Sequence, residues 1–185
     1  QTSNTSKRSS GTCASGGEQR DTIGKLINQA VEDGAQIISF SQSLGASDEL
    51  KWAVTNATAH GVIIVASSGN KSIDDNSKHM GQYSGVVGVS AIDTTGDFAS
   101  YSSWGNGVVT AAIGGPFISL DPNTNAPGST HGTSTSAAMV AGMLALARQK
   151  WPEATTNQIL QLLVHTGQNP NHDWNQYTGY GPIDG

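Results

Sequence analysis

A chain of 185 residues is long enough for one domain with a single layered core. Only 12% of the residues are charged, the net charge is -5, and no basic cluster is denser than Lys7-Arg8, which argues against nucleic-acid binding. No apolar run reaches the ~18 residues that a membrane span needs. Cys13 is the only cysteine, so the chain has no internal disulfide and no cysteine-based metal cluster.

The predicted elements alternate between helices and short apolar strands. Residues 1–20 are rich in Ser, Gly and charge and predict a flexible leader or loop, so the folded domain is expected over 21–185. Apolar residues at helical spacing predict a first helix that starts at Asp21 or Thr22 and ends at Gly34. The later elements are a strand over 35–41, a helix from Ser47 to Gly61, a strand over 62–67, a loop over 69–85, strands over 86–92 and 108–113, a loop to residue 130, and helices over 134–150 and 153–165.

The predicted strands are apolar on both faces, which indicates a sheet that is covered on both sides. Together with the alternation of strands and helices, this predicts an α/β domain: a doubly wound, mainly parallel sheet with helices on both faces. Sheets of this kind bind ligands beyond the carboxyl ends of their strands. The segments to consider are therefore "SSGN" (67–70), after the second strand, and "HGTS" (131–134), before the long helix.

Ser134 would lie at the N-terminus of the helix over 134–150. The unpaired backbone amides and the helix dipole favour negative charge there, which suits a nucleophilic serine whose attack produces an oxyanion. A purely structural role is also consistent with this position, because the side chain of Thr133 or Ser134 could cap the helix.

Asn70 follows a buried strand and a glycine that allows a sharp turn, in "VIIVASSGN" (62–70). Its side-chain amide could donate a hydrogen bond, although an asparagine after glycine is also common in plain turns. An asparagine at a strand end combined with Gly-Thr-Ser at a later helix start is much rarer than either feature alone.

Four segments resemble the subtilisin-like serine protease family, in that family's order and over residues 21 to the C-terminus. They are "GVIIVASSGN" (61–70), "FASYSSWG" (98–105), "GTSTSAAMVAG" (132–142) and "GYGPID" (179–184). The resemblance implies a serine endopeptidase that forms an acyl-enzyme, with Ser134 as the nucleophile and Asn70 as the oxyanion donor.

The family's other two catalytic residues lie in an Asp-x-Gly motif and a His-Gly-Thr-x-Val-Ala-Gly motif, and neither precedes residue 35. His131 also begins a His-Gly-Thr tripeptide, but six residues separate this tripeptide from Val-Ala-Gly, which is the spacing of the serine motif. The chain is therefore expected to be the C-terminal part of the peptidase domain. It would be inactive alone and would need an N-terminal fragment of the same protease that carries Asp and His. The alternative is a pseudoprotease that acts as a binding or scaffolding module.

The resemblance also implies the walls of the primary specificity cleft for a peptide or protein substrate. One wall would be Ser41, Gln42 and Ser43, and the other Ser67, Ser68 and Gly69. These serines predict a cleft that is more polar than usual in the family. The "SLG" at 43–45 leaves the register of the first wall open by two residues.

No cofactor and no metal ligand are expected, although "SIDDNS" (72–77) could contribute to the calcium binding that the family often shows. A solvated acidic loop is the favoured interpretation, because calcium needs six or more oxygen ligands and no regular ligand spacing is present. The low charge, 23 glycines and many Ser, Thr and Asn residues resemble a rigid enzyme that is secreted or extracellular.

Overall fold

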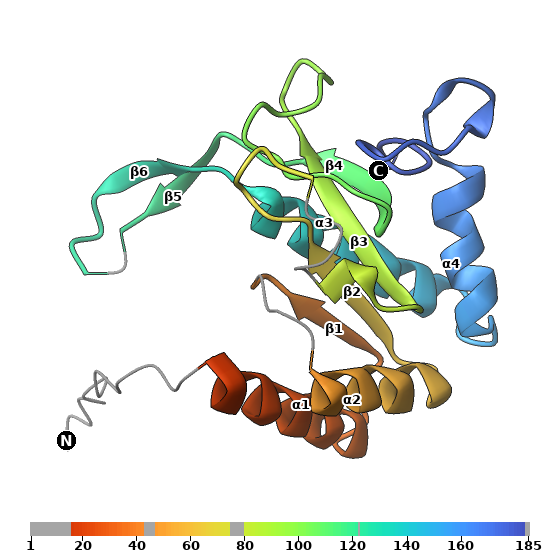
Figure 1. Cartoon of the computed structure of the whole chain (residues 1–185). Coiled ribbons are helices and arrows are strands. Elements are labelled where there is room, and N and C mark those ends of the chain that lie inside the picture. Colours follow the sequence, from red (N-terminus) through yellow and green to blue (C-terminus); the bar gives the residue numbers. More distant parts are fainter. Residues whose placement is uncertain (1–15, 43–46, 75–79, 122, 184–185) are drawn as a thin grey trace.

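The structure, a computed structural model, describes residues 16–42, 47–74, 80–121 and 123–183. It contains a four-stranded parallel sheet with helices on both faces (Figure 1). Residues 1–15, on which most of the predicted leader falls, lie outside the described residues, and so do Cys13 and Ser43. The predicted α/β fold with a parallel, doubly covered sheet is confirmed.

The sheet contains the four strands that the apolar runs predict. Its spatial order is β1-β2-β3-β4, and each neighbouring pair is parallel. The strands are β1 (Ile37–Phe40), β2 (Ile63–Ser67), β3 (Val86–Ile92) and β4 (Val108–Ile113). All residues of β2 and β3 are buried, because helices cover both faces of these two central strands.

Alternate residues of β2 divide between two hydrophobic cores. Ile64 and Ala66 belong to the core shared with α1 (Gly16–Glu32) and α2 (Asp48–Ala59). Ile63 and Val65 face the other way, into the core shared with α3 (Thr133–Lys150) and α4 (Thr156–His165). The continuous apolar run of β2 therefore serves two layers at once. The remaining helical segments are short 3₁₀ turns, η1 (Met80–Gln82) and η2 (Pro170–His172).

Two helix starts test the sequence signals at their N-termini. Helix α2 begins after Ser47, whose side chain accepts a hydrogen bond of 3.2 Å from the Leu50 N–H, as predicted. Helix α1 begins at Gly16 instead of Asp21, so the predicted start was too late. Glu18, Gln19 and Arg20 have high helix propensity and extend the helix before its apolar stripe begins.

An antiparallel hairpin occupies the segment before α3, where the sequence predicted only a loop. Its strands are β5 (Phe117–Leu120) and β6 (Pro127–Thr130). The Asp121 carboxylate stabilises the turn by accepting hydrogen bonds from Asn123 N–H and from Thr124 N–H and hydroxyl, and these donors lower the pKa of Asp121. The prediction was wrong because each strand has only four residues and β6, with the sequence Pro-Gly-Ser-Thr, contains no apolar run.

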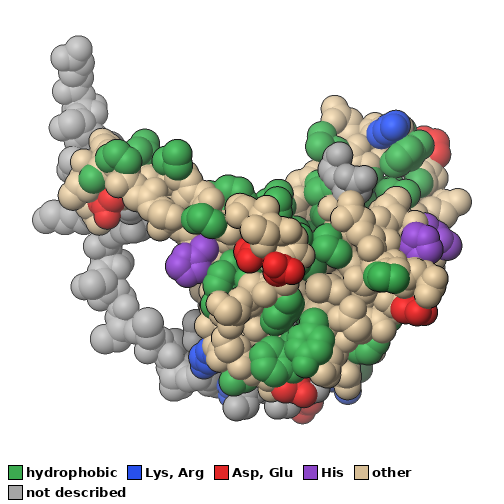
Figure 2. Space-filling model, turned by 90° about the horizontal axis from the view of Figure 1, so that it is seen from above, with side chains coloured by type: hydrophobic (Ala, Val, Ile, Leu, Met, Phe, Trp, Pro, Cys, Tyr) green, Lys and Arg blue, Asp and Glu red, His purple; other side chains and the backbone are tan. Residues whose placement is uncertain are grey.

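The hairpin projects from the body, and hydrophobic side chains lie along it (Figure 2). Ile118 is 91% exposed and Leu120 is 64% exposed. They alternate along β5 and so lie on one face of the ribbon. A two-stranded hairpin with a bare apolar face is marginally stable by itself, which favours a further contact there.

The two edge strands of the sheet, β1 and β4, differ in what lies beside them. The outer side of β4 is covered by the C-terminal segment, because Tyr180 N–H donates to Val109 O at 2.9 Å and Ile183 N–H donates to Ala111 O at 3.1 Å. Strand β1 is the end strand on the other side, with no further strand beside it in the part of the chain that the structure describes. Within that same part, no helix is long and apolar enough to cross a membrane.

We expect Ser47→Ala to lower the free energy of unfolding by about 1 kcal/mol, because it removes the acceptor for the Leu50 N–H at the start of α2. Urea unfolding followed by circular dichroism measures the change. Ser47→Asp retains a capping acceptor and serves as the control. Equal losses in both variants would mean that the cap does not stabilise α2.

Candidate active site

The ends of β2 and α3 meet at the carboxyl edge of the sheet. Asn70, just beyond β2, accepts two hydrogen bonds at Oδ1 from Thr133, the first residue of α3: one from the backbone N–H at 2.9 Å and one from the hydroxyl at 2.8 Å. The Gly69 N–H in turn donates to Thr133 Oγ1 at 3.1 Å. The structure thus brings together the two segments that the sequence singled out, although they are 63 residues apart.

Ser134 is the second residue of α3, beside this contact. The cap residue of the helix is Gly132, so the interpretation that Thr133 or Ser134 caps α3 is wrong. The Ser134 hydroxyl is partly exposed and makes a long hydrogen bond of 3.5 Å to the carbonyl oxygen of Ser41, at the end of β1. The candidate nucleophile therefore lies in the first turn of a helix, and its described hydrogen bond goes to Ser41 and not to the helix backbone.

Gly132 lets the two segments approach closely. Its φ of 152° lies in the region that favours glycine, and a Cβ at this position would lie 2.9 Å from Asn70 Nδ2. The Asn70 amide nitrogen therefore lies against the turn that leads into Ser134. The glycine before Thr133 was visible in the sequence, but its contact with Asn70 required the fold.

The plain-turn interpretation of Asn70 does not describe its hydrogen bonds. A turn asparagine bonds to its own neighbours in sequence, whereas Oδ1 here bonds to Thr133. The Asn70 side chain is exposed, and Nδ2 donates to no residue in the described part of the chain. A carbonyl or oxyanion that approached this edge would find an amide donor ready to bond.

The structure describes five of the six residues of the predicted specificity walls. Ser41 and Gln42 are exposed at the end of β1, and Ser43 lies outside the described residues. On the other wall, Ser67 is 3% exposed. Ser68 is fully buried, and its hydroxyl donates to Ser103 O at 2.8 Å, so this hydroxyl stabilises the loop and does not make the cleft more polar. Gly69 is also buried, with its N–H bonded to Thr133.

His131 does not act on Ser134 in this structure. Its ring is exposed and packs against Tyr101, with the ring centroids 4.9 Å apart, while the Ser134 hydroxyl bonds to Ser41. His60 is the C-terminal cap residue of α2, with Nδ1 2.8 Å from Asn56 O. The described histidines thus give no general base for Ser134.

The Tyr101 side chain lies beside the turn that leads into Ser134, a position with no signal in the sequence. Its hydroxyl is buried and lies near the Gly132 N–H, but that N–H donates to Gly114 O at 2.7 Å. The hydroxyl therefore has no hydrogen-bond partner among the described residues. Burial raises the pKa of the Tyr101 phenol, because it disfavours the phenolate.

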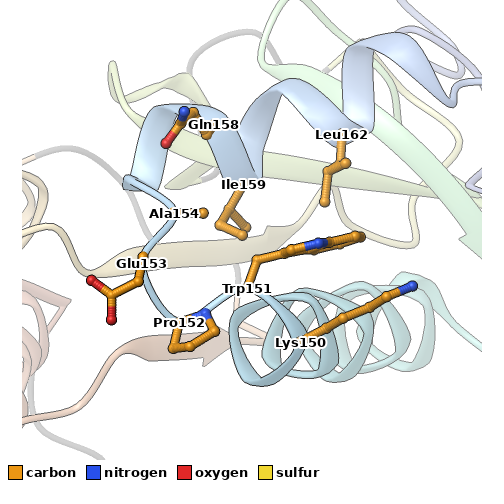
Figure 3. Close-up of a pocket in the computed structure, with 8 residues that line it drawn as sticks. All are labelled: Lys150, Trp151, Pro152, Glu153, Ala154, Gln158, Ile159 and Leu162. Atoms are coloured by element: carbon orange, nitrogen blue, oxygen red, sulfur yellow. The ribbon is translucent and has the colours of Figure 1, made fainter.

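A pocket of about 510 Å³ lies at the other end of α3 (Figure 3). The Trp151 indole lies across it, and Lys150 Nζ is 4.7 Å from the centre of that ring. Lys150 lies about 24 Å along the helix axis from Ser134, at 1.5 Å per residue. This pocket is therefore separate from the Ser134 site.

No three His, Cys, Asp or Glu residues come close enough to hold a metal ion in the described ranges. Residues 75–77 of the acidic segment over 72–77 lie outside those ranges. The favoured interpretation of that segment as a solvated acidic loop, and the alternative that it contributes to calcium binding, both stay predictions.

A partly exposed serine in the first turn of a helix that packs on a parallel sheet, with an asparagine amide beside it at the carboxyl edge of that sheet, is the arrangement of a serine hydrolase. The chain belongs to the subtilase family of serine peptidases, whose sequence profile matches residues 8–181.

Individual relatives agree with this assignment. Fervidolysin of Fervidobacterium pennivorans is 34% identical over 185 aligned residues, which cover 88% of this chain and 26% of that protein. Subtilisin DY of Bacillus licheniformis is 32% identical over 177 aligned residues, which cover 92% of this chain and 63% of that protein. The solved structure of MycP1 from the ESX-1 type VII secretion system matches with a TM-score of 0.80 at 26% identity, over 93% of this chain and 56% of that chain. The chain spans less than two thirds of the length of each of these proteins.

We expect Tyr101→Phe to leave the folded protein at least as stable at neutral pH, with a gain of roughly 1 kcal/mol, because it removes a buried hydroxyl that has no partner. The pKa of Tyr101 is raised above 10.0 on folding, so wild-type stability falls as the pH rises through this value and the unfolded tyrosine ionises. The advantage of the Phe variant should therefore grow in alkali.

Urea unfolding at neutral pH and at about pH 11 tests both statements. Tyr83→Phe is the matched control, because its hydroxyl accepts a hydrogen bond of 3.3 Å from the Ser47 N–H, so its loss should destabilise. A Tyr101→Phe variant that is less stable than wild type at neutral pH would show that the hydroxyl has a partner.

Proposed function

We propose that this chain supplies the nucleophile and one oxyanion donor of a serine endopeptidase. Ser134 Oγ attacks the carbonyl carbon of a peptide bond, and the carbonyl oxygen becomes an oxyanion. Asn70 Nδ2 and the Ser134 N–H, which belongs to the first turn and has no partner within the helix, stabilise that charge. The hydroxyl proton passes through a base to the leaving amine, and water then hydrolyses the acyl-enzyme. The observation that carries the proposal is the contact of Asn70 with Thr133.

The base and its aspartate are proposed to come from an N-terminal segment of the same protease. A serine hydroxyl is a weak nucleophile at neutral pH and needs an adjacent base. The described hydrogen bond of Ser134 goes to a carbonyl oxygen, which can accept but not shuttle a proton. In subtilisin, which gives the family its name, loss of the histidine lowers turnover on the order of 10⁶-fold. We therefore expect the chain to be inactive by itself.

The edge of β1 offers a place for that segment. A pocket of about 400 Å³ lies between α1 and β1, and it is lined in part by Ile23, Leu26, Ile38 and Phe40. Leu26 is 61% exposed, and exposed apolar surface beside an unpaired strand edge favours a further strand. A strand parallel to β1 would end at the level of Ser41, whose carbonyl bonds to Ser134. Its next residue would be close enough to contribute to the catalytic site.

Peptides or proteins are the proposed substrates, with the acyl side of the substrate along Ser41 and Gln42. The exposure of both residues at the end of β1 supports this position. Secretion is proposed from the composition. The chemistry requires only side-chain and backbone groups.

We expect the isolated chain to react with a fluorophosphonate probe far more slowly than an active serine protease, because Ser134 lacks a base. Co-expression with the N-terminal part of the protease should give rapid labelling of Ser134 and cleavage of peptides. Mass spectrometry of the labelled chain and a peptide-cleavage assay measure these results.

Ser134→Ala is the control for that experiment. It should abolish labelling and cleavage but leave the association intact, because the hydroxyl is not needed for packing. Rapid labelling of Ser134 in the isolated chain would contradict the need for a partner. A stable monomer with no partner and no cleavage in any mixture would instead support a pseudoprotease that serves as a binding or scaffolding module.

We expect Asn70→Ala to leave the reassembled protease folded, although two donors of the buried Thr133 lose their acceptor. We expect it to lower kcat by about 100- to 1000-fold. This is the loss that follows removal of one such donor in subtilisin, and it corresponds to about 3 to 4 kcal/mol at the transition state. Asn56→Ala is the matched control, since the Asn56 amide donates to Asn28 on the helical layer and should not affect turnover. Unchanged turnover in Asn70→Ala would remove Asn70 from the mechanism.

A further inference from the structure

Asn106 is the only asparagine in the sequence that directly precedes a glycine. Asn106 and Gly107 are the two central residues of a turn that leads into β4. The Val108 N–H closes this turn by donating to Gly105 O at 3.1 Å. Asn106 is exposed to solvent, whereas Val108 is fully buried. The Asn-Gly pair is therefore presented to water at the start of a buried strand.

The fold requires glycine at position 107. A Cβ at this position would clash with the carbonyl oxygen of Gly81, in η1. A Cβ on Gly88, in β3, would in turn clash with the carbonyl oxygen of Gly107. Three backbone segments thus approach one another too closely for any side chain between them. This packing explains why a glycine directly follows an exposed asparagine here.

We propose that Asn106 is a site of spontaneous deamidation. The backbone nitrogen of Gly107 loses its proton and attacks the carbonyl carbon of the Asn106 side chain, which closes a succinimide ring and releases ammonia. Water then opens the ring at either of its carbonyl carbons and leaves aspartate or isoaspartate. The net reaction consumes one water and exchanges the side-chain amide for a carboxylate. Glycine favours ring closure, because it carries no side chain beside the attacking nitrogen and its backbone rotates most freely.

Asn123 offers a comparison within the same chain. It is also exposed and also lies in a turn, but the next residue is Thr124, whose N–H donates to Asp121 Oδ1 at 2.8 Å. The β-branched side chain of Thr124 shields its backbone nitrogen, and the hydrogen bond holds that nitrogen in place. Both asparagines are thus exposed in turns, and the residue that follows distinguishes them.

The reaction would change the start of β4. Isoaspartate adds one carbon atom to the main chain before Gly107, which has no room to move against Gly81 and Gly88. Val108 O accepts a hydrogen bond of 2.8 Å from the Trp174 indole, so the change also reaches the C-terminal segment beside β4. The modified chain should therefore be less stable than the unmodified one.

Incubation of the chain of residues 1–185 at neutral and at mildly alkaline pH tests the proposal. Peptide mapping by mass spectrometry should show loss of the unmodified Asn106 peptide and gain of an aspartate and an isoaspartate form, while the Asn123 peptide stays intact. The loss should be faster in alkali, because the attacking nitrogen must give up its proton. Asn106→Gln should prevent it, since a glutamine would have to close a larger ring.

The same incubation in urea shows what the fold contributes. An Asn106 that reacts in the unfolded chain but stays intact in the folded one would overturn the proposal, because the turn would then protect it. Equal loss at Asn106 and Asn123, or a loss that does not depend on pH, would overturn it as well.

Urea unfolding of the incubated chain measures the consequence for β4. The modified fraction should unfold at a lower urea concentration than the unmodified chain, and Asn106→Gln should keep its midpoint throughout the incubation. An unchanged midpoint in a fully modified chain would overturn the effect on β4.

Discussion

The site depends on the contact between Asn70 and Thr133, because it ties the end of a central strand to the start of the helix that packs on the sheet. Strand β2 is fixed by two hydrophobic cores, one on each face, so its end has a defined position. Helix α3 packs on the same sheet, and Gly132 allows its first turn to reach Asn70 without a clash. The nucleophile and the amide therefore lie next to elements whose positions the core fixes.

The sequence could predict what depends on local pattern. Strands β1 to β4 are apolar on both faces, and the cap of α2 is a local signal, so both were found. Ser134 and Asn70 could be singled out as candidates because each lies at the end of a predicted element. The contact of Thr133 with Asn70 could not be found, since it joins residues 63 positions apart. The direction of the Ser68 hydroxyl, which turned out to bond to Ser103, likewise depends on tertiary packing.

The remaining errors have a different cause. The β5–β6 hairpin was missed because its strands are short and its exposed face carries Ile118 and Leu120, the reverse of an amphipathic strand on a core. The same reversal occurs on α3, where Met139 and Leu146 are exposed although the helix is apolar on nearly all sides. Both exposed surfaces lie on elements that lead to or from Ser134.

The exposure of the Asn70 amide has a consequence for how the protein can be produced. Asn70, Lys71 and Ser72 form an Asn-x-Ser tripeptide, which is an acceptor for N-linked glycans in cells that have this pathway. The sugar is attached to Nδ2, the same atom that would bond to the oxyanion, and it would occupy the space in front of Ser134. A glycosylating host would therefore yield a folded protein with a blocked site, whereas a host without this pathway would leave the amide bare.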